Sequence, residues 1–383
     1  MSGGVDSSLA AVLLKEAGFQ VIGLTMQLWG EQDRSYSPRC SSLEALDDAR
    51  EICRRLGIDH HLVDLQKQFS DRVVRSFVHE YLQGRTPNPC VLCNALIKWR
   101  CLLPRARKLG ARALATGHYA RVEEDPEGGR FQLLRGADES KDQSYALWGL
   151  SRDDLAATIL PLGGLTKVET RQMAAERGLL VAGKNESQEI CFVPEDNYGA
   201  FIENHIVSTS PHATANSESY PWSPGPIVDQ EGNILGQHRG LPFYTVGQRR
   251  GLGLSLGRPV YVVDIDRSFN RLVVGTERDL LHQHLWAHRL NWLSISPPRR
   301  AISCQVQIRY NHRAAPARLS TASTGDVHVE FDHPQRAITP GQSAVFYDRD
   351  VVLGGGVIRR PGPDEVAGLL PEGSSSSRME PSR

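Results

Sequence analysis

The 383-residue sequence contains no apolar run long enough to span a membrane and no pattern typical of a secretory signal peptide. Its net charge is zero, so the overall charge does not indicate a nucleic-acid partner. No internal repeat is evident. The seven cysteines, an odd number in a chain of this size, exclude the disulfide framework of a small secreted protein. We therefore expect a globular protein of two or three domains in a reducing compartment, with cysteines available for chemistry.

Residues 2–8, S-G-G-V-D-S-S, form the most informative stretch, although they lack the Gly-Lys-Ser/Thr ending of a Walker A loop. The adjacent Gly3 and Gly4 let a phosphate approach the backbone. Apolar side chains then recur at helical spacing up to Ala17, and Gly18 stands where a helix C-cap is expected. The glycines therefore lie at a predicted helix N-terminus, where free N–H groups favour an anion. An ordinary Gly-Ser turn before a helix is the alternative interpretation.

The first half of the chain alternates strand-like and helix-like segments, which favours a doubly wound parallel α/β sheet. We expect strands at 19–26, 61–65 and 112–116, and helices at 42–56, 67–82, 93–109 and 166–177, the last with Thr166 and Glu169 as a capping box. Ligands bind such sheets at the carboxyl ends of the strands, where residues 2–8 and Gly117-His118 would lie. A strand should precede residues 2–8, yet the sequence opens at Met1. We therefore expect a late start codon or a truncation, and reduced stability.

The second half alternates apolar and polar residues between glycine turns, which predicts short antiparallel strands. The segment 207–226 is predicted as a loop, and strands are expected at 225–235, 244–253, 260–274, 301–310, 317–319, 327–331, 343–348 and 351–357. The predicted organisation is a catalytic α/β domain at 1–200, a small β domain at 201–280, a β-barrel at 281–360 and a disordered tail at 361–383. Arginines without acidic neighbours at 232–263 and 286–319 indicate either a phosphate-backbone contact or a solvated basic face.

Two polar segments carry cysteines. Residues 86–94, T-P-N-P-C-V-L-C-N, place Cys93 at the start of a predicted helix, where the helix N-terminus would lower the pKa of a thiol. Cys191 follows about a hundred residues later in S-Q-E-I-C-F. The remaining cysteines are expected to lie in the core, at Cys53, Cys101 and Cys304, or in a loop, at Cys40.

Several kinds of cysteine site fit this pattern to different degrees. A zinc site would need four ligands, and only one C-x-x-C pair is present. A thioredoxin-like redox pair would need a different surrounding fold. A [4Fe–4S] cluster on Cys90, Cys93 and Cys191, with one iron left open, is chemically reasonable. A reactive pair formed by Cys93 and Cys191 alone needs fewer thiols.

Six motifs together resemble the tRNA-specific 2-thiouridylase family, a branch of the PP-loop ATP-pyrophosphatases. They are S-G-G-V-D-S-S, T-P-N-P-x-x-x-C-N, A-T-G-H-Y-A-R, K-D-Q-S-Y, S-Q-E-I-C-F and Y-T-V-G-Q-R-R-G-L-G, in the family's order, and the resemblance extends to about residue 358. The resemblance implies ATP-dependent 2-thiolation of the wobble uridine of tRNA. The C2 oxygen would be adenylated, and sulfur would come from a Cys191 persulfide with Cys93 as the nucleophile.

The resemblance also implies the site residues. ATP with Mg²⁺ would be bound by Ser2, Gly3, Gly4, Val5, Asp6, Ser7, Ser8, Met26 and Gly117. The tRNA would be contacted by Asn88, Pro89, Cys90, His118, Lys141, Asp142, Gln143, Ser144, Tyr145, Arg309, Tyr310 and Gln342. Many family members carry Asp at the position of Cys90, so the role of that Asp cannot be transferred. The extra thiol leaves the [4Fe–4S] route open as an alternative to the persulfide route.

The family further implies glutamate, glutamine and lysine tRNAs as substrates, and a cysteine desulfurase or sulfur-relay protein as the sulfur donor. We expect a monomer without membrane attachment, cytoplasmic in a bacterium or organellar in a eukaryote. Two other functions remain to be weighed. An argininosuccinate-synthase-like ligase would need neither the cysteine pair nor the barrel. A catalytically silent tRNA-binding protein is suggested by the missing first strand.

Overall fold

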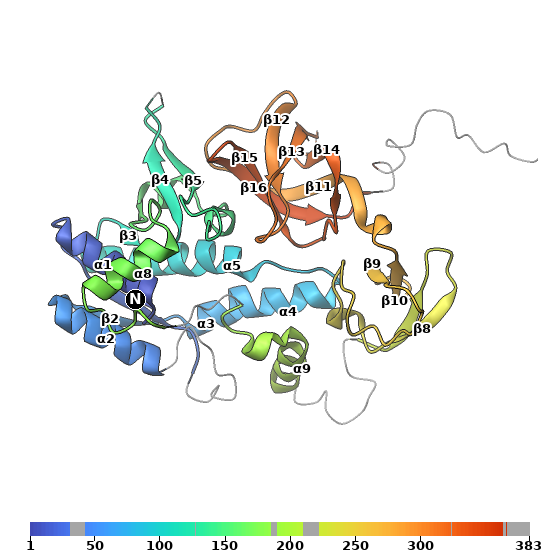
Figure 1. Ribbon diagram of the computed structural model, residues 1–383, viewed down its shortest axis with the longest axis horizontal. Coiled ribbons are helices and arrows are strands. Elements are labelled where there is room, and N and C mark those ends of the chain that lie inside the picture. The colour runs from blue at the N-terminus through green and yellow to red at the C-terminus, as the bar shows by residue number, and fades with distance from the viewer. Residues whose placement is uncertain are drawn as a thin grey trace, which may run out of the picture.

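The computed structural model describes residues 1–30, 43–126, 128–184, 190–209, 222–322, 324–362 and 365. Figure 1 shows an elongated molecule with the N-terminal α/β region at one end, a β-barrel above its middle and a small β region at the other end. Among the described residues, no helix is both long and apolar enough to cross a membrane. Cys40 and most of the predicted tail lie outside the described residues.

The N-terminal region contains two parallel strand pairs and the helices that flank them, although the strand at 158–159 and the helix at 152–156 were not predicted. Its strands are β1 (Gly23–Gln27) paired with β2 (His60–Asp64), and β3 (Leu114–Ala115) paired with β6 (Thr158–Ile159), both pairs parallel. Its flanking helices are α1 (Val5–Glu16), α2 (Leu43–Leu56), α7 (Arg152–Ala156) and α8 (Lys167–Glu176). The capping box of Thr166 and Glu169 is present as predicted. Met1 lies beside β1, because its carbonyl accepts a hydrogen bond from the Thr25 hydroxyl.

Two long helical segments lie below the barrel and contain π-helical stretches. The first comprises α3 (Gln66–Phe69), a π-helical stretch at Ser70–Val74 and α4 (Arg75–Leu82). The second comprises α5 (Pro89–Leu92), a π-helical stretch at Cys93–Leu102 and α6 (Leu103–Lys108). The sequence predicted that the second helix begins at Cys93, but it begins at Pro89. The fixed φ of Pro89 suits the first helical position, and Asn88 forms the N-cap.

The small β region is a four-stranded sheet that follows α9 (Tyr198–Thr209), a helix that the sequence analysis missed. Its strand order is β8 (Ile234–His238), β7 (Gly225–Val228), β10 (Arg271–Gly275) and β9 (Tyr261–Asp266). The predicted strand at 244–253 was wrong. Gly247, Gly251 and Gly253 all have positive φ values there, which are incompatible with a pleated strand. Most of the predicted loop 207–226 lies outside the described residues.

The barrel is closed by six antiparallel strands. They are β11 (Leu281–Trp292), β12 (Ile302–Gln307), β13 (Ala315–Thr321), β14 (Val327–Arg336), β15 (Ser343–Asp348) and β16 (Val351–Arg359), and pairing of β11 with β16 closes the ring. Alternate residues of β14, namely Val327, Val329 and Phe331, are fully buried inside it. The alternation in the sequence thus predicted five of the six barrel strands, whereas β11 was missed.

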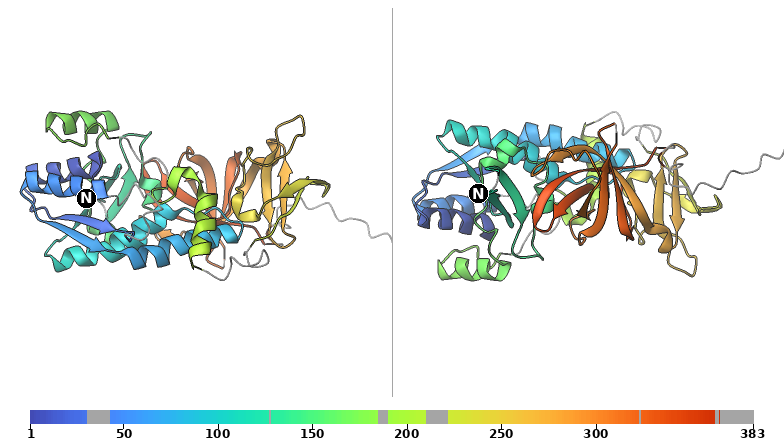
Figure 2. Two further views of the ribbon diagram at one scale, coloured as in Figure 1. Left: turned by 90° about the horizontal axis from the view of Figure 1, so that it is seen from below. Right: turned by 90° about the horizontal axis from the view of Figure 1, so that it is seen from above.

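An unpredicted hairpin connects the barrel to the α/β region. Strands β4 (Ala120–Glu124) and β5 (Phe131–Arg135) pair with each other, and Leu134 of β5 pairs with Val351 of β16. The barrel sheet therefore continues into the N-terminal region, as the two views of Figure 2 show. The domain limits at 200, 280 and 360 stay predictions.

Candidate active site

The N-terminus of α1 offers backbone N–H groups to an anion. Gly4 is the N-cap, and no side chain caps the helix. The hydroxyls of Ser7 and Ser8 donate to the Gly4 carbonyl at 3.2 and 2.8 Å, which fixes the turn. The N–H groups of the first turn cannot be satisfied within the helix, so they and the helix dipole favour a phosphate at this position.

Close backbone approaches explain why glycine stands at the key positions of this loop. Gly3 has a φ of +69°, and a Cβ there would lie 2.3 Å from the carbonyl oxygen of Ala45. A Cβ on Gly117, just after β3, would lie 2.7 Å from the backbone carbon of Asp6. A Cβ on Gly4 would meet only the Ser2 hydroxyl, at 3.5 Å, so this side of the loop is free for a phosphate. These residues fit the triphosphate of ATP, and Gly117 lies against them.

Asp6 is held by two side chains that the sequence analysis did not identify. Lys167, at the start of α8, donates to both carboxylate oxygens of Asp6 at 2.7 and 2.9 Å. The Tyr119 hydroxyl donates to Asp6 Oδ1 at 2.8 Å. The Lys167 side chain is only 9% exposed, whereas that of Asp6 is 33% exposed, so the ion pair is partly shielded from solvent. Asp6 therefore orients the loop and does not present a free carboxylate to a metal. Met26, the other predicted adenine-nucleotide contact, is half-buried at the end of β1.

The three predicted site cysteines come together. Cys90 is exposed in the first turn of α5, whereas Cys93 and Cys191 are half-buried. They lie close enough that a charge on Cys191 raises the pKa of both other thiols. Chain segments about a hundred residues apart thus meet at one place, as the sequence predicted.

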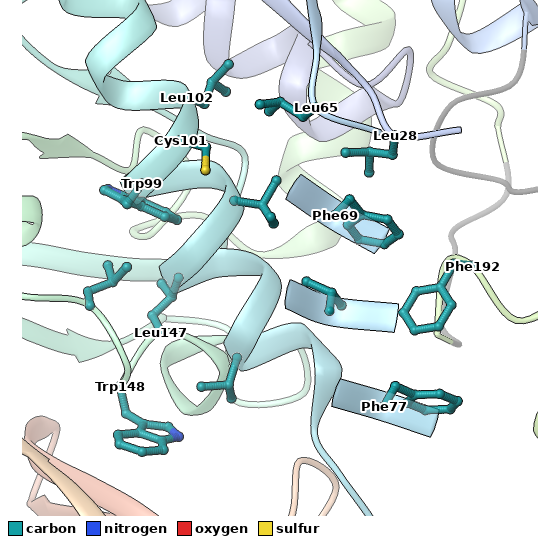
Figure 3. Close-up of a cluster of buried hydrophobic side chains, with 14 of the residues drawn as sticks. Leu28, Leu65, Phe69, Phe77, Trp99, Cys101, Leu102, Leu147, Trp148 and Phe192 are labelled. Atoms are coloured by element: carbon teal, nitrogen blue, oxygen red, sulfur yellow. The ribbon is translucent and has the colours of Figure 1, made fainter. Parts of the chain in front are cut away.

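The position of Cys191 is fixed by its neighbour Phe192. The Phe192 ring packs edge-on against Phe69 and Phe77, with centroid distances of 5.5 and 5.2 Å (Figure 3). Phe192 is 2% exposed, and edge-to-face pairs each stabilise by about 1 kcal/mol. The aromatic core beneath α3 and α4 therefore anchors the chain at the residue next to the thiol.

The expected lowering of the Cys93 pKa was wrong. Burial raises the pKa of the Cys93 thiol to about 12, and the nearby Lys98 ammonium opposes this only in part. The helix begins one turn earlier than predicted, so Cys93 does not lie at its N-terminus. Burial also raises the pKa of Cys90, although solvent at its exposed surface screens that effect. At neutral pH both thiols are protonated in this conformation.

A polar chain runs from these thiols to the loop after β3. Lys98 lies 3.2 Å from His118 Nε2, and His118 Nδ1 lies 2.7 Å from the Thr116 hydroxyl. An ammonium group only donates, so Nε2 must be the acceptor and Nδ1 must carry the proton. Burial and the Lys98 charge hold the pKa of His118 well below its ordinary value. His118 is therefore neutral, and Lys98 is the cation beside the cysteines.

The [4Fe–4S] alternative does not fit this arrangement. Within the described ranges, no three His, Cys, Asp or Glu side chains are placed so that they could hold a metal ion. Cys90, Cys93 and Cys191 are near one another without forming such a group. We therefore derive no step through a cluster.

The barrel holds the segment that precedes Cys90. The Gln342 side-chain amide donates to the carbonyls of Thr86 and Pro87 at 3.1 and 3.2 Å. Tyr145 is hydrogen-bonded to the Asn88 side chain, and its hydroxyl donates to the Ser343 carbonyl at 3.0 Å. Asn88, Tyr145 and Gln342, all predicted as tRNA contacts, thus meet at one junction and support the loop.

Several predicted tRNA contacts are structural in this conformation. Ser144 and Tyr145 are fully buried, so they lie outside any surface that a tRNA could touch here. Asp142 accepts hydrogen bonds from Arg135, from the Gly136 N–H and from both the N–H and the hydroxyl of Ser144. The sequence K-D-Q-S-Y therefore forms a turn that the barrel covers. Its polar composition gave no indication that Ser144 and Tyr145 are buried.

The other predicted tRNA contacts are more accessible. Cys90 and Tyr310 are exposed, whereas Pro89 is buried and the rest are half-buried, namely Asn88, His118, Lys141, Gln143, Arg309 and Gln342. The Tyr310 ring packs edge-on against Tyr145 at 6.3 Å. The Gln143 side-chain oxygen accepts from the Tyr119 N–H, and Arg309 donates to the Arg336 carbonyl. An accessible aromatic ring thus borders the junction.

Comparisons with known proteins define the class of this chain. Residues 1–195 match the family described as tRNA methyl transferase HUP domain, residues 217–276 the tRNA methyl transferase PRC-barrel domain, and residues 282–358 the aminomethyltransferase beta-barrel domain. The protein is thus a HUP-type, adenine-nucleotide α-hydrolase-like protein with two appended β domains.

Curated relatives specify the family further. The tRNA-specific 2-thiouridylase MnmA of Heliobacterium modesticaldum is 45% identical, and the match covers 97% of each chain. The proteins of the same name from Moorella thermoacetica and Chloroflexus aggregans are both 48% identical over 94% of this chain, and over 98% and 97% of their own. The chain belongs to the tRNA-specific 2-thiouridylase family, which confirms the resemblance inferred from the motifs.

Proposed function

We propose that this protein catalyses ATP-dependent 2-thiolation of the wobble uridine of tRNA, with sulfur supplied by a persulfide on Cys191. The observation that carries the proposal is the proximity of Cys191 to Cys93, because a charge on Cys191 raises the pKa of Cys93. The family membership of the chain supports sulfur transfer to tRNA. The free N–H groups at α1 support the use of ATP.

Residues around α1 would bind ATP through the N–H groups of residues 3–7 and the hydroxyls of Ser2, Ser7 and Ser8. Bound ATP would supply the adenylyl group that makes the uracil C2 oxygen a good leaving group, as AMP. Mg²⁺ would be bound chiefly by the phosphates, because Asp6 is occupied by Lys167 and Tyr119. Gly117 would lie beside the nucleotide, since it already contacts the loop.

The cysteines would then transfer sulfur in two bond changes. The terminal sulfur of the Cys191 persulfide attacks C2 and displaces the oxygen. The Cys93 thiolate attacks Cys191 Sγ, so the S–S bond of the persulfide breaks and a Cys93–Cys191 disulfide forms. An external thiol must supply two electrons to reduce that disulfide. Lys98, the cation beside Cys93, would stabilise the Cys93 thiolate.

The family also suggests the partners of the reaction. Glutamate, glutamine and lysine tRNAs are the proposed substrates, and a cysteine desulfurase or a sulfur-relay protein is the proposed donor. The target base must leave the anticodon stack to reach the thiols. Tyr310, exposed beside Tyr145 and the loop before Cys90, offers a ring on which a base could stack.

The test measures 2-thiouridine in unmodified tRNA after incubation with the full-length protein, ATP, Mg²⁺, cysteine and a cysteine desulfurase. We expect Cys93→Ala and Cys191→Ala to abolish product, because each removes one of the two required sulfur atoms. Cys304→Ala is the matched control, since this thiol lies on β12 of the barrel and should not affect the yield. Cys90→Ser distinguishes the persulfide route from the [4Fe–4S] route, because only the cluster would need the Cys90 thiol.

The results distinguish the persulfide route, the [4Fe–4S] route and a catalytically silent tRNA-binding protein. Product from iron-free protein that survives Cys90→Ser supports the persulfide route. Product that requires bound iron and disappears in Cys90→Ser contradicts it. Wild-type protein that binds tRNA and ATP but yields no 2-thiouridine with any donor would identify a silent binding protein instead.

A further inference from the structure

A cavity of about 250 Å³ lies where α4, the start of the Arg85–Pro89 segment, β11 and the end of β16 meet. Its lining contains four arginines, one histidine and a single carboxylate residue, namely Arg85, Arg289, Arg359, Arg360, His288 and Glu80. The cavity lies outside the set of residues assigned above to ATP and sulfur transfer.

Three of the four guanidinium groups are held in place by carboxylates. Arg85 donates to both oxygens of Glu80. Arg359 donates to Asp326 and Glu365, and Arg360 donates to Asp264, but these three acids do not line the cavity. Within the described part of the chain, Arg289 has no ion pair and no hydrogen bond, and its side chain is exposed. Arg289 is thus the one lining arginine whose N–H donors are all available.

The backbone conformation that places Arg289 in the cavity is strained. Strand β11 bulges there, because His288 pairs with Val357 of β16 while Asn291 pairs with Gly355. Arg289 has a φ of +51°, a left-handed conformation that glycine adopts without strain. Bulges of this kind redirect side chains. A strained arginine at a bulge, in a cavity with three other arginines, indicates a function for its side chain.

The charges of the cavity arginines act on the neighbouring His288. Burial lowers the pKa of His288, and the charges on Arg289, Arg359 and Arg85 lower it further against the opposing effect of Asp326. His288 is therefore neutral at neutral pH and can still donate one hydrogen bond. Several fixed guanidinium donors, one free guanidinium and a neutral imidazole match a tetrahedral oxyanion better than a planar apolar ligand.

We propose that this cavity binds a phosphate group, with Arg289 as the main ligand and Arg85, Arg360 and His288 as further donors. The phosphate is either a phosphodiester of the bound tRNA or free inorganic phosphate, and only the first source rests on the proposed function. Arg85 favours the first source. It precedes Cys90 by five residues, so its Cα lies within about 18 Å of the Cα of Cys90 even if the segment is fully extended.

The test compares the full-length wild type with Arg289→Ala, Arg289→Gly and the control Arg318→Ala. Arg318 is an exposed arginine on β13 that does not line the cavity. Arg289→Gly should fold at least as well as wild type, because glycine suits the positive φ. Binding of labelled tRNA is measured by fluorescence anisotropy over a series of salt concentrations. Thermal unfolding is measured in potassium phosphate and in potassium chloride of equal ionic strength.

We expect both Arg289 variants to weaken tRNA binding about fivefold or more and to reduce the slope of log affinity against log salt by about one. Arg318→Ala should change binding less. If tRNA binding is unchanged but the phosphate-specific rise in Tm of the wild type disappears in the Arg289 variants, free phosphate is the ligand. If the folded Arg289 variants match wild type in both measurements, the proposal is overturned. Failure of the wild type to bind tRNA would contradict the proposed function alone, since the phosphate measurement would still decide this site.

Discussion

Lys167 Nζ lies 2.7 and 2.9 Å from the two carboxylate oxygens of Asp6, although 161 residues separate them in the sequence. The pair joins the N-terminus of α8 to the proposed ATP loop. It also neutralises a carboxylate that would otherwise repel a triphosphate bound at α1. Loop geometry and local electrostatics therefore depend on the same contact.

Replacing Lys167 by Met should destabilise the protein by about 2 kcal/mol, because a partly buried carboxylate loses its cation. It should also weaken ATP binding, since Asp6 would then repel the phosphates. Urea unfolding followed by circular dichroism and titration with a fluorescent ATP analogue check the two effects.

Tyr119→Phe is the control for the Lys167 variant, because it removes one hydrogen bond from an uncharged donor to the same carboxylate. It should cost about 1 kcal/mol and leave the Lys167–Asp6 pair intact. Equal losses of stability and ATP affinity in the two variants would show that the charge of Lys167 has no special role.

Cys93 should react slowly with iodoacetamide near neutral pH. Its pKa is raised to about 12, so the thiolate fraction increases about tenfold per pH unit between pH 8 and pH 10. An unperturbed thiol, with a pKa of about 8.5, would level off in that range. Mass spectrometry of the labelled peptide gives the rate at each pH.

Lys98→Met should slow this alkylation further at every pH, because the ammonium lowers the pKa of Cys93. Lys108→Met removes an exposed lysine at the end of α6 and serves as the control. A plateau in the wild-type profile below pH 9 would contradict the raised pKa of the half-buried Cys93 thiol.

Local signals in the sequence predicted several elements correctly, although the helix start at Pro89 and the glycine turns at 244–253 were misinterpreted. The glycines before α1, the capping box at Thr166 and the alternation in β14 depend on residues a few positions apart. The meeting of Cys93 and Cys191 was predicted only because the motifs resemble a known family. Neither spacing nor composition could have placed thiols that far apart side by side.

Other missed features depend on contacts between distant segments. Nothing near Lys167 in the sequence indicates that it pairs with Asp6, and the pair forms only when α8 packs beside α1. The hairpin at 120–135 is short and carries charged residues, so only its pairing with Val351 of the barrel explains its strands. Burial of the segment around Ser144 likewise follows from the barrel that covers it.

Gln342→Ala should free the segment that leads to Cys90. The variant leaves the carbonyls of Thr86 and Pro87 without their side-chain donor, which should cost about 1 to 2 kcal/mol. We expect slower formation of 2-thiouridine with unchanged ATP affinity, because the α1 loop is not touched. Gln305→Ala, on the exposed face of β12, is the matched control. Loss of ATP binding in Gln342→Ala would show instead that the barrel junction and the α1 loop act as one unit.

Gly117→Ala tests whether the close contact between the loop after β3 and Asp6 shapes the nucleotide site. The new Cβ would lie 2.7 Å from the Asp6 backbone carbon and 2.8 Å from its Cβ, so one of the two loops must move. We expect ATP affinity to fall by about tenfold or more, since the N–H groups at the start of α1 would no longer converge on the phosphates. Gly164→Ala is the control, because a Cβ at that glycine has no heavy atom within 4 Å. Isothermal titration of both variants with ATP and Mg²⁺ gives the comparison. If Gly117→Ala binds ATP as tightly as Gly164→Ala, the nucleotide does not use the N-terminus of α1 in the way proposed, and the role of residues 2–8 would have to be reassigned.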